Sequence, residues 1–206
     1  MSAEIGKVTL EVFSDYVCPW CYLATPSIEK LQSRYPLDIK WMSFPLHPDT
    51  PQEGLLLEEL FRGRDIKPVQ EMLKGRMASE GLPYGERTMT YNSRQAQELG
   101  KWAATQPGGE AIHKAIFQAY FVQGLNIART DVLLDIVAAV GLNTELAREV
   151  IEQGTFAAQV DQDWALSRSY GISGVPSFVA VNQMVVGCQP YDELEAFVQY
   201  LFQDDT

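Results

Sequence analysis

The chain has few cysteines, few histidines and few basic residues, and each shortage narrows the classes of protein it can belong to. Three cysteines and two histidines among 206 residues leave a short list of metal ligands. Lysine and arginine together number 16, against 27 aspartate and glutamate residues, which gives a formal net charge of −11. Such an acidic chain is repelled by phosphate groups, so we expect no nucleic-acid partner and no membrane partner.

The sequence also lacks a recognisable leader and long apolar runs. Residues 1–7 hold no basic stretch followed by an apolar run and a cleavage site, and no run reaches the length of a membrane span. We therefore expect a cytoplasmic protein, although a secreted chain that had lost its leader would look the same. In a reducing compartment, a lone close pair of cysteines is more often reactive or metal-binding than structural.

The order of apolar patterns predicts a mixed α/β fold. Runs rich in β-branched and large apolar residues occur at 8–13 and 38–44, with a helical stretch between them. Two strands joined in this way pair in parallel through a right-handed crossover. Near the end, runs at 177–181 and 184–188 flank Asn182-Gln183 and predict an antiparallel hairpin.

A mostly helical block separates these two strand-bearing ends. Between residues 52 and 170 strand-like runs vanish, and apolar residues recur at helical spacing. A last amphipathic helix is predicted over 191–202. The predicted order is therefore β-α-β, a helical insertion, and β-β-α.

The motif that can carry chemistry is Cys18-Pro19-Trp20-Cys21, which stands where the first strand gives way to a helix. Unpaired backbone N–H groups at a helix start stabilise a thiolate, so Cys18 is the predicted nucleophile. Pro19 suits the first helical position, where its missing N–H costs nothing. Cys21, one turn further in, is the predicted resolving thiol. It would attack the mixed disulfide that forms on Cys18.

The alternative interpretation of this cysteine pair is half of a zinc site. Such a site would need two more ligands, taken from Cys188, His47 and His113. A second closely spaced ligand pair is missing, and the first pair opens a long helix with an apolar face. We therefore predict no metal site, and we interpret both histidines as surface or packing residues.

Two distant segments carry a family resemblance. They read Phe13-Ser14-Asp15-Tyr16-Val17-Cys18-Pro19-Trp20-Cys21-Tyr22 and Gly171-Ile172-Ser173-Gly174-Val175-Pro176-Ser177-Phe178. They resemble the FrnE-type branch of the DsbA thioredoxin-like family, and the similarity extends over nearly the whole chain. The resemblance implies a thioredoxin-like domain formed by residues 1–51 and 171–206, with a large all-helical insertion at 52–170. It also implies a redox-active dithiol opposite a cis-proline loop.

The resemblance further implies roles for single residues. Pro176 would follow a cis bond and pack against the dithiol, while the Val175 backbone would pair with an extended substrate segment. Pro19 and Trp20 would also contact substrate, with Trp20 as an exposed aromatic lip. Related proteins bury an acid beneath the dithiol to move protons. Glu11 is the candidate for that acid, and an edge-facing Glu11 is the alternative.

Two features set the chain apart within this family. The strongly oxidising periplasmic members carry Pro-His where this chain has Pro19-Trp20, so no histidine supports the thiolate and we expect a weaker oxidant. The third cysteine, Cys188, follows a strand that returns toward the rim of the site. We interpret it as a small buried thiol. The alternative is a secondary redox role, in which Cys188 forms a disulfide with Cys18 under oxidative stress.

Three functions compete at this point. The first is a disulfide oxidoreductase or isomerase for protein or small-molecule disulfides, without a bound cofactor and with glutathione or a dithiol reductant as candidate co-substrate. The second is a glutathione-dependent enzyme of the hydroxychromene-carboxylate isomerase or kappa transferase type. Those enzymes share the core and insertion, but they typically carry a serine where this chain has Cys18. The third is a polypeptide-binding chaperone. The sequence leaves the oligomeric state open.

Overall fold

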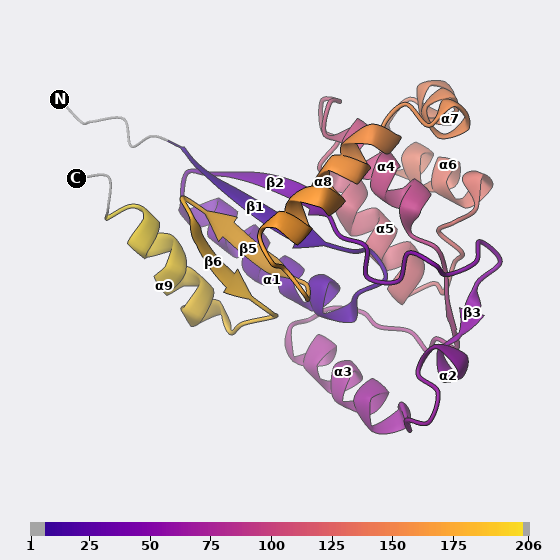
Figure 1. Cartoon of the computed structure of the whole chain (residues 1–206), viewed down its shortest axis with the longest axis horizontal. Helices are drawn as coiled ribbons and strands as arrows, with labels where there is room; N and C mark the ends of the chain where they lie inside the picture. The colour runs from indigo at the N-terminus through magenta and orange to yellow at the C-terminus, as the bar shows by residue number, and fades with distance from the viewer. Residues whose placement is uncertain (1–6, 204–206) are drawn as a thin grey trace.

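The computed structural model describes residues 7–203 and is organised around a four-stranded sheet with helices on both faces (Figure 1). The strand order is β2-β1-β5-β6. The strands are β1 (Val8–Ser14), β2 (Leu37–Ser43), β5 (Ser177–Ala180) and β6 (Gln183–Val186). β1 and β2 are parallel, whereas β5 is antiparallel to both β1 and β6. The predicted β-α-β unit and the predicted hairpin are therefore confirmed.

Alternation along β1 explains why the sheet packs on both faces. Leu10 and Val12 are buried on the face covered by α1 (Pro19–Arg34) and α9 (Tyr191–Leu201). Side chains of successive strand residues point to opposite faces, so Glu11 and Phe13 lie on the other face. That face is covered by α4 (Arg94–Ala103) and α8 (Ala157–Ser169), both of which contact β2.

The helices that lie in the sequence between β2 and β5 form a helical layer beside the sheet (Figure 1). Besides α4 and α8, they are α2 (Leu57–Leu60), α3 (Lys67–Ser79), α5 (Ala111–Phe121), α6 (Thr130–Ala139) and α7 (Thr144–Gln153). One buried apolar cluster contains Phe13, Cys18 and Cys21 together with Leu99 and Phe117 of the helical layer. This cluster joins residues from both sides of the predicted boundaries at 51 and 170, so the division of the chain at those positions stays a prediction.

Two local expectations are corrected by the structure. A short antiparallel pair, β3 (Leu55–Leu56) with β4 (Met89–Thr90), lies inside the region that was expected to hold no strand. Two-residue strands are too short to produce a recognisable alternation. The hairpin turn is formed by Val181 and Asn182, both with positive φ, and Gln183 already belongs to β6. Asparagine tolerates positive φ. Two successive residues with positive φ form a two-residue turn whose twist matches that of the flanking strands.

Both ends of the chain lie largely outside the described residues. The described part of the chain includes Lys7 but not residues 1–6. It also excludes residue 206, where the predicted thioredoxin-like domain ends. Across residues 7–203, no helix combines the length and the apolar character that a membrane span needs.

Candidate active site

The two cysteines lie at the start of α1, directly after the turn that leaves β1. Cys18 is the N-cap residue of α1, Pro19 is its first helical residue, and the Cys21 N–H donates to the Cys18 carbonyl at 3.1 Å. Both thiols are free and buried, with 2% of Cys18 and 1% of Cys21 exposed. The structure thus brings the predicted pair together at a helix start, where backbone N–H groups lack helical partners.

The cis-proline loop lies against the first of these thiols. The Val175–Pro176 peptide bond is cis, as expected from the resemblance. The Cys18 Sγ donates a hydrogen bond to the Val175 carbonyl at 3.4 Å. Cys18, Val175 and Pro176 therefore meet in one place although 157 residues separate Cys18 from Val175.

The two thiols differ in their environment. Burial raises the pKa of Cys21 well above its ordinary value, and the neighbouring Cys18 thiol raises it further. A thiol with a raised pKa is mostly protonated at neutral pH and is a slow nucleophile. This environment suits Cys21 to act second, after Cys18 has formed a bond to a partner sulfur.

A buried acid near the dithiol was missed by the sequence reasoning. Asp15, three residues before Cys18, is 1% exposed, and its carboxylate accepts hydrogen bonds from the backbone N–H groups of Val17 and Leu46. Burial raises the pKa of Asp15, and these hydrogen bonds oppose the shift. The available signal was an acidic residue inside the apolar run that leads to the cysteines.

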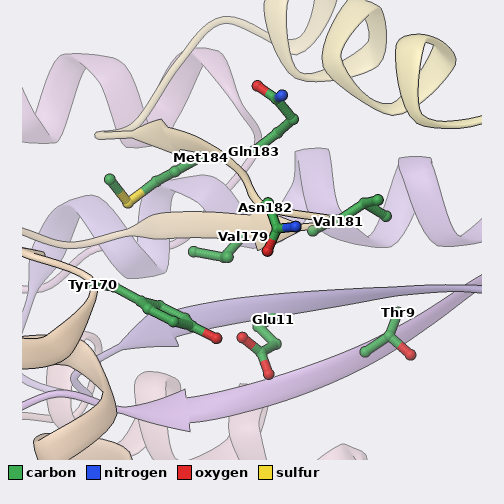
Figure 2. Close-up of a pocket in the computed structure, with 9 residues that line it drawn as sticks. Thr9, Glu11, Tyr170, Val179, Val181, Asn182, Gln183 and Met184 are labelled. Atoms are coloured by element: carbon green, nitrogen blue, oxygen red, sulfur yellow. The ribbon is translucent and has the colours of Figure 1, made fainter. Parts of the chain in front are cut away.

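The acid that was singled out, Glu11, lies elsewhere. Figure 2 shows its side chain between Thr9 and Tyr170, in a cavity of about 430 Å³ against β5 and β6. None of the dithiol and cis-proline residues lines this cavity. β1 is an inner strand, with β2 and β5 on its two sides, so the alternative of a Glu11 at an edge of the sheet does not hold. The proton-transfer role of Glu11 stays a prediction.

A larger cavity, of about 480 Å³, opens beside Cys18. Pro19, Trp20 and Val175 line it together with Cys18, so the structure brings the predicted substrate-contacting residues to one space. Most other lining side chains are apolar and come from the region of α2 and α3. They include Leu57, Leu60, Ile66, Val69 and Leu73, and Leu46 joins them from the loop after β2.

The expected exposure of Trp20 is found only in part. The Trp20 side chain is half-buried and packs against the main apolar cluster. The guanidinium group of Arg76, from α3, lies over its ring at 5.4 Å. No local pattern predicts this contact, because the helix that provides Arg76 begins 46 residues after Cys21, at Lys67.

The two histidines lie in different places. His47 lines the dithiol cavity, and burial lowers its pKa while the charge of Asp15 opposes the shift. His113 is buried, and its Nδ1 is 2.7 Å from the Tyr16 hydroxyl. Among residues 7–203, no three side chains of histidine, cysteine, aspartate or glutamate are grouped so that they could hold a metal ion.

Cys188 is a half-buried free thiol that packs against both apolar clusters. Burial raises its pKa to about 11. The charge of Arg76 opposes this shift, whereas Cys18 raises the pKa of Cys188 by a smaller amount. Cys188 is therefore a protonated, slow thiol at neutral pH. Its secondary redox role stays a prediction.

Comparison with known proteins agrees with this geometry. A family model described as a DSBA-like thioredoxin domain matches residues 9–199. A probable DsbA oxidoreductase from Streptomyces coelicolor is similar in structure, with a TM-score of 0.84 and 26% identity over 95% of this chain and 89% of the other.

Two further solved structures share the fold at lower identity. A 2-hydroxychromene-2-carboxylate isomerase has a TM-score of 0.77 and 16% identity, covering 96% of this chain and 97% of its own. The cytosolic disulfide reductase DsbM from Pseudomonas aeruginosa, in a structure with GSH, has a TM-score of 0.71 and 22% identity. That match covers 95% of this chain and 100% of DsbM. The same architecture therefore occurs in proteins described as a disulfide reductase and as a small-molecule isomerase.

Proposed function

Because this chain belongs to the family of DSBA-like thioredoxin domains, we propose that it is a thiol-disulfide oxidoreductase whose redox pair is Cys18 and Cys21. The observation that carries the proposal is the placement of Cys18 at the N-cap of α1, with its Sγ on the Val175 carbonyl and Cys21 one turn further in. A thiol at a helix start is well placed to react as a thiolate.

The proposed reaction has two displacement steps. The Cys18 thiolate attacks one sulfur of a substrate disulfide, forms a mixed disulfide and releases the other sulfur as a thiolate. Cys21 then loses its proton and attacks the Cys18 sulfur, which releases the second substrate thiolate. The substrate gains two electrons, and the Cys18–Cys21 disulfide holds the oxidised state until a dithiol or glutathione reduces it.

Val175 has two roles in this proposal. Its carbonyl holds the Cys18 thiol proton in the resting state, and the backbone next to Pro176 is positioned to pair with an extended substrate segment. Loss of the thiol proton frees that carbonyl to accept from a substrate N–H. We expect the cycle to need no bound cofactor and to operate in a reducing, cytoplasmic compartment.

The proposal is tested by reduction of insulin disulfides with glutathione as the electron source. The Cys18→Ser variant should lose the activity, whereas Cys21→Ser should accumulate a mixed disulfide on Cys18. Cys188→Ser is the matched control and should retain at least half of the wild-type rate. Full activity in Cys18→Ser would refute the proposal.

A second candidate function is a glutathione-dependent isomerase or transferase. The observation that favours it is the apolar cavity of about 480 Å³ beside Cys18, which is a suitable volume for a small organic substrate. Glutathione-dependent turnover of a small aromatic acid that survives Cys18→Ser would support this function over the first. If Cys18→Ser loses insulin reduction and no such turnover is found, the result would support the oxidoreductase.

A further inference from the structure

We propose that Arg87 forms a carboxylate-binding subsite in the dithiol cavity, so that the chain selects small disulfides that carry a carboxylate on an apolar body. This inference rests on the proposed function, because it names the substrate class of the same site. Arg87 and Cys18 line one cavity, although Arg87 belongs to the loop before β4 and Cys18 to the start of α1.

The guanidinium group of Arg87 is held by aromatic rings. Its central carbon lies 4.6 Å from the ring centre of Tyr120 and 4.5 Å from that of Phe121. Rings stacked on a guanidinium group fix its plane and remove it from water without satisfying its N–H donors. Arg87 is therefore rigidly placed but still in need of hydrogen-bond acceptors.

The donors of Arg87 are poorly satisfied. Its Nε and Nη1 atoms are buried and have no hydrogen-bond acceptor within the described part of the chain. Its Nη2 donates to the Tyr84 hydroxyl at 3.5 Å, which is the outer limit for such a bond. Leaving buried charged donors unpaired costs free energy that an acceptor in the cavity would recover.

Arg87 also lacks a counter-ion, although two of its guanidinium nitrogens are buried. Arg34, Arg94 and Arg129 each form an ion pair with a carboxylate, whereas no ion pair involves Arg87 among residues 7–203. The single acid that lines the same cavity, Asp65, is exposed and accepts from the Lys67 N–H at 3.1 Å. A ligand anion would supply the missing charge.

The rest of the cavity determines what kind of anion fits. Leucine, isoleucine, valine and aromatic side chains form most of its wall, and its volume of about 480 Å³ matches a small organic molecule. A strongly hydrated inorganic ion would leave this apolar wall without a partner. A carboxylate can accept two parallel bonds from a guanidinium group while an apolar body fills the space toward Cys18.

The reaction that follows is the first displacement at Cys18. With its carboxylate on Arg87, the bound disulfide places a sulfur toward the Cys18 thiolate. A Cys18–ligand disulfide forms, and the other half of the ligand leaves as a thiolate. The subsite contributes binding and orientation, and it takes no part in the electron transfer.

Two chromogenic disulfides separate carboxylate recognition from thiol reactivity. Dithiobis(nitrobenzoate) carries a carboxylate on each aromatic ring, whereas dithiodipyridine is neutral. Both are to be reacted with full-length protein carrying Cys21→Ser and Cys188→Ser, in which Cys18 is the one remaining thiol. Adding Arg87→Gln should slow the nitrobenzoate reaction by about tenfold or more relative to the dithiodipyridine reaction, as expected for loss of a charged hydrogen-bond donor.

Two further variants control this measurement. Arg64→Gln removes an exposed arginine from the rim of the same cavity and should change the ratio of the two rates by less than twofold. Arg87→Lys keeps the charge but loses the planar pair of donors, so it should give an intermediate ratio. The dithiodipyridine rate measured in each variant corrects for any change in folding or access.

The outcomes distinguish this inference from the proposed function. The carboxylate subsite would be overturned if Arg87→Gln slowed both reagents equally, or if Arg64→Gln changed the ratio of the two rates as much as Arg87→Gln did. Either result could occur in a protein that still reduces insulin. Failure of the wild-type dithiol to reduce insulin would instead overturn the proposed function itself.

Discussion

The Asp15 carboxylate accepts a hydrogen bond from the Leu46 backbone N–H at 3.0 Å and so connects the turn before Cys18 to the loop after β2. The other carboxylate oxygen accepts from the Val17 N–H at 3.2 Å. The bond from Val17 is buried and the bond from Leu46 is partly buried, and together they fix the approach of β1 to the dithiol.

Asp15→Ala should therefore destabilise the fold. It leaves two backbone N–H groups without acceptors, and each such loss costs about 1–3 kcal/mol when the group is buried. We expect the free energy of unfolding in urea to fall by about 2 kcal/mol or more. Asp49→Ala, at an exposed acid a few residues after Leu46, is the control and should stay close to the wild type. Equal stability of the two variants would contradict this role for Asp15.

His113 should make the fold sensitive to mild acid. Burial lowers its pKa to about 3, against an ordinary value near 6.5, and the charge of Lys101 lowers it further. Since the pKa is lower in the folded chain, the unfolded chain binds the proton first, and stability is lost as the pH falls from about 6.5 toward 3. Lowering the pH from 7 to 5 should cost about 2 kcal/mol through this residue.

Urea unfolding of wild type and His113→Gln at the two pH values measures this contribution. Glutamine offers an oxygen to the Tyr16 hydroxyl but does not titrate, so the variant should lose less stability between pH 7 and pH 5. The carboxylates are common to both proteins and cancel in the difference. An identical pH dependence in both proteins would show that His113 does not contribute.

Cys188 should react slowly as a free thiol, because burial raises its pKa to about 11. Alkylation of a Cys18→Ser/Cys21→Ser protein should accelerate steadily with pH over the whole accessible alkaline range. The secondary redox hypothesis is tested in Cys21→Ser after mild peroxide treatment, by peptide mapping for a Cys18–Cys188 disulfide. Absence of that crosslink would leave Cys188 as a packing residue.

Glu11→Gln should leave the dithiol chemistry intact. The Glu11 side chain occupies a cavity that it shares with Thr9 and Tyr170 and that none of the dithiol residues lines. We expect its rate of insulin reduction, and the pH profile of that rate, to stay within twofold of the wild type. A profile displaced by a full pH unit would support the proton-transfer role that the family resemblance implies.

The parts of the fold that follow from local pattern could be predicted. The apolar runs of β1 and β2 and the helical stretch between them carry enough signal to give a parallel pair. The position of Cys18 before Pro19 likewise identifies a helix start. The hairpin could also be predicted, although its turn lies one residue earlier than expected because Val181 as well as Asn182 adopts positive φ.

The parts that depend on distant contacts could not be predicted. Asp15 is an ordinary acidic residue in the sequence, and its role arises from burial against a loop 31 residues away. The rings that hold Arg87 come from α5, and the ring that meets Arg76 comes from α1. No spacing rule connects these positions, because folding alone brings them together.

The burial of Cys18 has a kinetic consequence. Cys18 is 2% exposed, so a reagent in bulk solvent gains full access to its sulfur when the cis-proline loop and the side chains that line the neighbouring cavity move apart. At high concentrations of any alkylating agent, the rate of Cys18 modification should reach a plateau that is the same for reagents of different reactivity. That plateau would measure how often the resting protein opens.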